Sequence, residues 1–383
     1  MLISQRARFD IPRDVCYLNA ASWSPLPLAV QEAARAAVGR KGQPWKLPAS
    51  FASEQNEAAR AAAARLINAD PDCVALIPSV GYGVATAAKV LPVAAGSRVI
   101  TLADDHSSPV LPWLAVAGER RITVETVARP ADGDWTAAVL AAIERSGAPP
   151  VALASISSVH WSDGGAVDCD RIAPALRRQG AMLLVDATHG AGVNAIDVRA
   201  LDPDVLIFPT YKWLLGPYGR AFMYIARRHH DGVPLEQTSH GRRSVKAEQS
   251  VYFLDTRYLP DARRYDMGER DHFISMEMAA KGIEYILDIG QAAVEERLEW
   301  LTGRIASGLA GSPYTVPERR IRSPHVLSIG LPGIDANDLV SRLAAENIHV
   351  APRLGRIRIS PHVYNDEEDV DRLVAALKRH AAR

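Results

Sequence analysis

Residues 182–219, MLLVDATHGAGVNAIDVRALDPDVLIFPTYKWLLGPYG, contain two short apolar runs, each followed by a charged residue. The first run, residues 182–185, ends directly at Asp186, and the second, residues 204–208, precedes Lys212 in the segment PTYKW. Short continuous apolar runs are typical of strands that are buried on both faces of a mostly parallel sheet. The pattern therefore predicts a carboxylate at the end of one strand and an amine just beyond the end of another.

A carboxylate and a lysine in these positions meet two chemical needs of a pyridoxal 5'-phosphate (PLP) site. The lysine holds the aldehyde as a Schiff base, and the carboxylate keeps the pyridine nitrogen protonated so that the ring can withdraw electrons. A buried Asp186 also needs a cationic partner, because an unpaired carboxylate in an apolar environment loses its charge or destabilises the fold. Taken singly, Asp186 could be a turn residue and Lys212 a solvated surface residue. Together they predict a PLP site in which both are catalytic.

The segments DATHG (186–190) and TYKW (210–213) resemble the class V aminotransferase family of fold-type I PLP enzymes. The resemblance extends from residues 17–21 to residues 358–365 and favours the branch of kynureninase and isopenicillin-N-epimerase-like proteins over the cysteine desulfurases. It implies an α/β fold with a mostly parallel seven-stranded sheet in a large domain and a smaller α+β C-terminal domain. We expect the large domain to span residues 16–260 and the small domain to combine residues 1–15 and 261–383.

The rest of the chain fits this architecture, because β-rich runs alternate with helical stretches. The expected strands are residues 74–77, 98–102, 122–127, 151–156, 182–186, 204–208 and 220–225. Helical spacing covers residues 29–40 and 53–67, where Ser53 offers a helix start, and returns from about residue 273 onward. A long polar segment, residues 231–264, is a candidate for a functional loop or a subunit contact.

A phosphate group is often bound by the backbone N–H groups at the start of a helix, where small residues allow a close approach. The turn PSVGYG (78–83) lies between an expected strand and an apolar helix, and the resemblance assigns the amides of Val80 and Gly81 to phosphate binding. Such glycine-containing turns are weakly specific when taken alone. The hydroxyls of Thr210 and Tyr211, next to Lys212, are further candidates to reach the phosphate.

Three histidines match cofactor-contacting positions of the family. His106 corresponds to the aromatic residue that stacks on the ring, where an imidazole could also transfer a proton. His189 corresponds to the residue beside the phenolate oxygen, and His160 to a segment that reaches the same oxygen. A zinc site is the weaker interpretation, because these histidines come from separate loops without metal-binding spacing, so no metal is expected.

Arg358 is the expected ligand of the substrate α-carboxylate, and Arg353 is an additional candidate. Bidentate binding there would orient the scissile bond of the substrate. Strand alternation places Arg356 on the same face as Arg358, but we interpret Arg356 as a charge on an exposed edge strand. The family resemblance also implies a homodimer with its active sites near the subunit interface.

Composition narrows the classes of partner and compartment. The chain has 383 residues with 44 basic and 44 acidic side chains, so its charge gives no reason to expect nucleic acid or a membrane surface as a partner. Its three cysteines show no CxxC pair, which favours a reducing cytoplasm. We expect neither a signal peptide nor a membrane-spanning segment.

The motifs indicate a common chemistry but do not choose among its outcomes. Residues 347–355, the loop where cysteine desulfurases carry their nucleophilic cysteine, contain none here, which disfavours persulfide transfer. The remaining reactions on an α-amino acid begin with an external aldimine and removal of the Cα proton by Lys212. We expect an aminotransferase or a β-elimination lyase. Kynureninase-like C–C cleavage, a racemase or epimerase, and a non-catalytic PLP-binding regulator remain alternatives.

Overall fold

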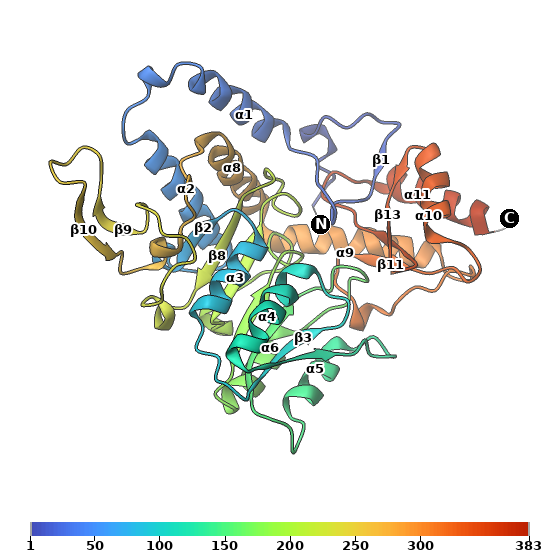
Figure 1. Cartoon of the computed structure of the whole chain (residues 1–383). Helices are drawn as coiled ribbons and strands as arrows, with labels where there is room; N and C mark the ends of the chain where they lie inside the picture. The colour runs from blue at the N-terminus through green and yellow to red at the C-terminus, as the bar shows by residue number, and fades with distance from the viewer. Residues whose placement is uncertain (1, 382–383) are drawn as a thin grey trace.

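A seven-stranded sheet forms the centre of the computed structural model, which describes residues 2–381 (Figure 1). In spatial order its strands are β2 (Val74–Ile77), β8 (Ala221–Ile225), β7 (Val205–Pro209), β6 (Met182–Asp186), β5 (Val151–Ser157), β3 (Arg98–Leu102) and β4 (Thr123–Val127). All neighbouring strands are parallel except that β8 is antiparallel to both β2 and β7. The predicted fold class is confirmed, and each of the seven runs expected as a strand forms one.

Helices cover both faces of this sheet, which explains why its central strands are apolar on both sides. Helices α3 (Val80–Val90) and α4 (Ser107–Arg120) pack on one face, where Val84 and Trp113 join a buried cluster. The other face is covered by α2 (Phe51–Leu66), α5 (Trp135–Ile143) and α6 (Cys169–Arg178). Short α7 (Val198–Leu201) lies between β6 and β7 in the chain.

The starts of α3 and α2 show where local signals locate a helix start and where they do not. Ser79 caps α3, because its Oγ accepts a hydrogen bond of 3.2 Å from the Tyr82 amide. The expectation that Ser53 starts a helix is wrong. Helix α2 already begins at Phe51, and the Ser53 hydroxyl donates to the Ser50 carbonyl within the first turn.

The C-terminal part adds a second, smaller sheet. Its elements are α8 (Phe273–Ile289), α9 (Gln291–Gly308), β11 (Leu327–Ile329), α10 (Ala336–Ala345), β12 (Ile348–His349), β13 (Ala351–Arg353), β14 (Arg356–Ile359) and α11 (Glu367–Ala381). Strand β14 lies between β11 and β13, both antiparallel to it. Arg356 therefore lies on a central strand and not on an edge, which corrects its interpretation as an edge-strand charge.

The N-terminal segment contributes to a further sheet of two strands, separate from that of β11, β14 and β13. Strand β1 (Cys16–Tyr17) pairs in parallel with β12, and α1 (Leu28–Lys41) packs with α2 against α8. The predicted domain boundaries at residues 15/16 and 260/261 remain a prediction.

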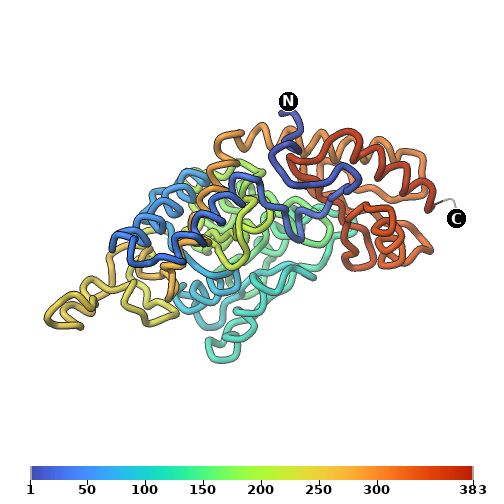
Figure 2. The backbone as a smooth tube through the Cα atoms, turned by 90° about the horizontal axis from the view of Figure 1, so that it is seen from above, coloured from blue at the N-terminus to red at the C-terminus, as the bar shows by residue number. Residues whose placement is uncertain are grey.

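Residues 231–264, expected to be irregular, contain the hairpin of β9 (Arg242–Val245) and β10 (Phe253–Tyr258). The hairpin extends away from the body of the molecule (Figure 2). Four consecutive apolar residues near its tip, 251–254, are exposed by 50% or more. In residues 2–381 no helix combines the length and apolar character needed to cross a membrane.

One helix of the C-terminal part directly supports the loop that carries Lys212. Gly282 of α8 faces the Leu214 carbonyl oxygen so closely that a Cβ on Gly282 would overlap it, and this Cβ would lie 3.2 Å from Gly216. The absence of a side chain at Gly282 therefore sets how closely α8 approaches the loop.

We predict that Gly282→Ala destabilises the protein by about 1–3 kcal/mol, because the added methyl group must displace backbone atoms. Gly303→Ala is the matched control, since Gly303 lies within α9 and a Cβ there meets nothing within 4 Å. The control should gain about 0.5–1 kcal/mol from helix propensity. Urea unfolding measures both changes. Equal effects of the two substitutions would contradict close packing at Gly282.

Candidate active site

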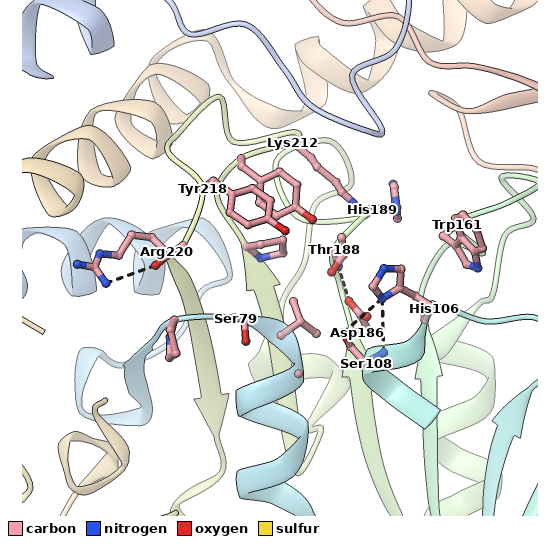
Figure 3. A pocket seen from close by; sticks show the side chains of 17 residues that line it. Ser79, His106, Ser108, Trp161, Asp186, Thr188, His189, Lys212, Tyr218 and Arg220 are labelled. Carbon is pink, nitrogen blue, oxygen red and sulfur yellow. Dashed lines mark hydrogen bonds between the residues drawn. The ribbon is translucent and has the colours of Figure 1, made fainter. Parts of the chain in front are cut away.

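The candidate site lies at the edge of the large sheet where the parallel strands end, which is where open α/β sheets bind ligands. Segments that follow β2, β3, β5, β6 and β7 line a cavity of about 180 Å³. Strand β8, being antiparallel, begins at this edge and contributes Arg220. Figure 3 shows Asp186 and Lys212 on opposite sides of the cavity, with the start of α3 below.

Lys212 carries a buried amine at the top of this cavity. Lys212 lies in the loop that follows β7 and is only 7% exposed. Its Nζ lies 3.2 Å from His189 Nε2. Burial, together with the positive charge of Arg358, lowers the pKa of Lys212 to about 7, against the opposing effect of the charge of Asp186. A large fraction of Lys212 is therefore a free amine at neutral pH, as a nucleophile or base requires.

The tautomer of His189 follows from its neighbour Trp213. Trp213 Nε1–H donates a 3.1 Å hydrogen bond to His189 Nδ1, and an indole N–H can only donate. Nδ1 therefore carries a lone pair, and a neutral His189 holds its proton on Nε2, facing Lys212. Burial and the charge of Lys212 lower the pKa of His189 well below its ordinary value, so the ring stays neutral.

The indole of Trp213 is itself held in place. It packs against the His362 ring at 5.5 Å and contacts the His325 ring edge-on at 4.3 Å. His325 Nε2–H also donates to the His189 carbonyl. Burial lowers the pKa of His325 to about 3 and that of His362 to about 4, so both rings stay neutral near pH 7.

Asp186 presents a carboxylate without a cationic partner. Its residue is 3% exposed, and Oδ1 accepts a 2.9 Å hydrogen bond from the Thr188 amide. Within residues 2–381, no basic side chain forms an ion pair with Asp186. A buried carboxylate that borders a cavity and lacks a counter-ion fits a protonated ring nitrogen as its ligand.

A second acid, Asp105, lies beneath the cavity and was not singled out from the sequence. Its carboxylate accepts hydrogen bonds from Ser157 Oγ at 2.8 Å and from the His106 amide at 2.7 Å. Burial raises the pKa of Asp105 to about 6, the charge of His160 opposes this change, and the charge of Asp186 adds to it. Asp105 thereby ties the start of α4 to the end of β5.

The start of α3 forms a cradle suited to an anion. The first intrahelical bond is that of the Gly83 amide to the Ser79 carbonyl, so the amides of Val80 and Gly81 precede it and point out of the helix. A Cβ on Gly81 would lie 3.7 Å from Ser108 Oγ, which places Ser108 at the border of the cradle. These amides, together with the helix dipole, fit a phosphate group.

Arg220 also borders this part of the cavity, and sequence reasoning missed it. It is 8% exposed, and its Nε donates a 2.7 Å hydrogen bond to Ser275 Oγ. Burial lowers its pKa, and no carboxylate in the described chain pairs with it. The signal that could have found Arg220 is an antiparallel β8, since only then does the residue that directly precedes this strand lie at the ligand-binding edge.

Aromatic side chains surround the mouth of the cavity. The rings of Tyr211 and Tyr218 lie 4.3 Å apart, and Lys212 Nζ lies 5.4 Å from the Tyr211 ring centre. His106 meets the ring of Trp161 edge-on at 6.0 Å. Loss of hydration lowers the pKa of His106, with a further decrease from the charge of Lys212.

Two predicted cofactor ligands do not border the cavity, which corrects their expected placement. Thr210 is fully buried, and its hydroxyl donates to the Pro217 carbonyl at 2.6 Å, closing the lysine loop. His160 is also fully buried, stacks on Trp135 at 4.8 Å and donates from Nε2 to the Ala103 carbonyl. Both side chains are used by the scaffold, and Trp161, next to His160, borders the cavity instead.

The two predicted carboxylate-binding arginines lie just behind the cavity wall. Arg358 donates to the Trp161 carbonyl at 2.6 Å and to Ser22 Oγ at 2.7 Å, and Arg353 donates to the same Ser22 Oγ at 2.9 Å. Burial lowers the pKa of Arg358 to about 9, and the nearby charge of Arg353 adds to this decrease. Ser22 was not predicted, and no sequence signal marks it.

Comparison with known proteins identifies the family. The model of the class V aminotransferases matches residues 16–373, so the chain belongs to this family. It is 28% identical to the uncharacterized aminotransferase YcbU of Bacillus subtilis, over 86% of this chain and 84% of that protein. It is also 28% identical to isopenicillin N epimerase of Amycolatopsis lactamdurans, over 97% of each chain.

Solved structures show the same fold. Cysteine desulfurase from Thermococcus onnurineus superimposes with a TM-score of 0.86 at 20% identity, covering 98% of this chain and 97% of that one. Probable cysteine desulfurases also match in sequence, so the comparisons do not separate the epimerase-like branch from the desulfurases. The protein is a PLP-dependent enzyme of the class V aminotransferase family.

The lowered pKa of Lys212 predicts selective labelling of the apo-protein. A solvated lysine titrates near pH 10.4, whereas acetylation of Lys212 should increase with pH around a midpoint near 7. Competitive labelling with acetic anhydride, quantified by peptide mass spectrometry, measures this midpoint. Asp186→Asn should lower it and Arg358→Met should raise it, because each removes one of the charges that act on the amine. A midpoint above about pH 9 would contradict the burial of a neutral amine.

Proposed function

We propose that this enzyme binds an α-amino acid and removes its Cα proton with Lys212, leading to amino transfer or β-elimination. The observation that carries the proposal is a buried lysine amine, with a pKa near 7, in a cavity that also holds an unpaired aspartate. An amine with this pKa can both attack a carbonyl carbon and accept a proton at neutral pH.

The cavity's polar groups fit the cofactor at each end. When bound, PLP supplies a ring that stabilises negative charge at the substrate Cα. Lys212 would hold the aldehyde carbon, and Asp186 would pair with the ring nitrogen. The amides of Val80 and Gly81, with the charge of Arg220, would hold the phosphate, and the Tyr211 hydroxyl is a further candidate contact.

The remaining residues orient groups and protons. His189 holds a proton on Nε2 and would donate it to an acceptor oxygen beside Lys212. His106 also borders the cavity and would contact the face of the pyridine ring of PLP. Arg358 would bind the substrate α-carboxylate, because its Nε has no hydrogen-bond partner and it forms no ion pair within the described residues. A fixed carboxylate sets which bond at Cα faces the base.

Persulfide transfer is disfavoured by where the cysteines lie. Cys16 and Cys73 are buried, Cys169 lies on α6, and none of the chain's three cysteines borders the cavity. Strands β13 and β14 are joined by the two-residue turn of Leu354 and Gly355, both with positive φ. Such a tight turn leaves no mobile loop to carry a nucleophile.

Epimerisation is the second candidate reaction. It is favoured by the match to isopenicillin N epimerase over nearly the whole of both chains. It shares the first step, proton removal at Cα, and differs in returning the proton to that carbon.

We also propose that the enzyme acts as a homodimer in the cytoplasm. The exposed apolar residues 251–254 of the β9–β10 hairpin support contact with a second copy of the chain. Three free cysteines support a reducing compartment.

The reaction is tested by mixing the PLP-loaded enzyme with single amino acids, without a keto acid, and measuring products and stereochemistry. One keto acid per site without ammonia indicates amino transfer, and accumulating keto acid with ammonia indicates β-elimination. Loss of optical purity without either product indicates epimerisation. Lys212→Ala should abolish turnover and the visible absorption of lysine-bound PLP. Turnover that survives this substitution would disprove the role of Lys212.

The hydrogen bond from Trp213 to His189 predicts that Trp213, although outside the cavity, keeps the proton of His189 on Nε2. In Trp213→Phe, His189 can move its proton to Nδ1, and Nε2 can then accept from a Lys212 ammonium. The labelling midpoint of Lys212 should therefore rise, and kcat should fall about tenfold, as expected for one misplaced hydrogen bond. Trp45→Phe is the control, because Trp45 is 77% exposed. An unchanged midpoint in Trp213→Phe would show that Trp213 does not set the tautomer.

A further inference from the structure

A second cavity of about 420 Å³ lies on the other side of the segment that follows β5. Trp161 borders the first cavity, whereas Ser162 and Asp163 border the second. Trp161 Nε1–H donates to the carbonyl of Asp104, a residue that borders the second cavity, at 2.7 Å, so this indole lies at the boundary between the two spaces. Figure 3 shows Trp161 at the edge of the first cavity, beside His106.

Four arginines and three aspartates border this second cavity, which we call the arginine cavity. Arg129 is the arginine that pairs with these acids, because it forms an ion pair with Asp163 and lies 3.7 Å from Asp104. Asp132, the third acid, accepts a 3.0 Å hydrogen bond from the Asp134 amide. The positive charges of the other three arginines remain without a carboxylate partner.

These three, Arg322, Arg353 and Arg356, contact only neutral oxygens. Arg356 donates to Ser328 Oγ at 3.1 Å and to the Ser328 carbonyl at 2.9 Å. Arg322 is 3% exposed, and its Nε has no hydrogen-bond partner. Across residues 2–381 no ion pair involves any of the three. Arg353 and Arg356 are partly exposed. Removing unpaired guanidinium groups wholly or partly from water is unfavourable, so this arrangement fits a site that receives an anion.

The arginine cavity is coupled to the expected position of the substrate. Arg353 lies 5.7 Å over the Trp161 ring, and it shares the Ser22 hydroxyl with Arg358. Arg353 and Arg356 are direct partners across β13 and β14, so both guanidinium groups belong to one rigid hairpin. An α-carboxylate bound at Arg358 would therefore lie close to the arginine cavity, because the hydroxyl of Ser22 accepts hydrogen bonds from both Arg358 and Arg353.

We propose that the arginine cavity binds a carboxylate at the end of the substrate side chain, so that the preferred substrate is a dicarboxylic α-amino acid. The proposal rests on the proposed function, because it places the α-amino group at Lys212 and the α-carboxylate at Arg358. Arg353 and Arg356 supply the side-chain contacts as charge-assisted hydrogen bonds, and the substrate side chain passes beside Trp161 at the boundary of the two cavities.

The test compares each acid with its neutral amide on the PLP-loaded enzyme. Aspartate, glutamate and α-aminoadipate cover three side-chain lengths. We expect at least one acid to exceed its amide in kcat/KM by about 10- to 100-fold, as charge-assisted hydrogen bonds allow. Arg356→Met should remove this preference by raising KM for the acid alone. Arg320→Met is the matched control, because Arg320 pairs with Glu318 on the surface and borders neither cavity.

Binding of glutarate, which has no amino group, gives a second readout that needs no turnover. Calorimetry should show that glutarate binds, that Arg356→Met weakens it by about tenfold or more, and that it competes with the amino acid substrate. If no amino acid is turned over but glutarate still binds through Arg356, the proposed function fails and the anion site stands. Absence of any preference for the acid over its amide would overturn the substrate assignment. Glutarate binding without competition would also overturn it, because it would indicate a free anion as the ligand of the cavity.

Discussion

The approach of Lys212 to His189 depends on the parallel pairing of β6 with β7. In this register Asp186 is opposite Ile207, so both strands end at one edge and their following loops must share the same small space. The contact between the amine and the imidazole, at 3.2 Å, is then made inside the protein and not in water. Because burial penalises the charged form, this single placement keeps His189 neutral, leaves a large fraction of Lys212 uncharged near pH 7, and gives Lys212 its chemical reactivity.

Both cavities are bordered or backed by charged side chains that lack a partner of opposite charge among the described residues. Asp186, Arg220, Arg358 and Arg353 are wholly or partly buried, and in residues 2–381 none of them forms an ion pair. Each such group opposes folding, and the two large apolar clusters on the faces of the sheet offset this opposition. The enzyme thereby keeps one negative and several positive positions free for groups of a ligand. The protein's own salt bridges lie elsewhere, as with Arg60 and Asp266, which are buried together at 2.8 Å.

Some site residues were predictable because their signal is local. Asp186 ends one apolar run and Lys212 follows another, and the cradle at Val80 and Gly81 follows from a turn between a strand and a helix. Thr210 and His160 also lie next to such signals, yet their side chains bind the scaffold, since a neighbouring position in sequence does not fix the direction of a side chain. Arg220 was missed because its place depends on the direction of β8 within the sheet.

The sequence by itself determined the order and length of the apolar strands, the residues that follow each strand, and hence the fold class and the family chemistry. These depend on burial and on backbone hydrogen bonding over a few residues, which local patterns report. Only the tertiary structure decided the tautomer of His189, the meeting of Arg353 and Arg358 at Ser22, and the position of Trp161 at the boundary of two cavities. Each of these joins residues from 24 to 336 positions apart, and such contacts are set by packing that no local pattern encodes.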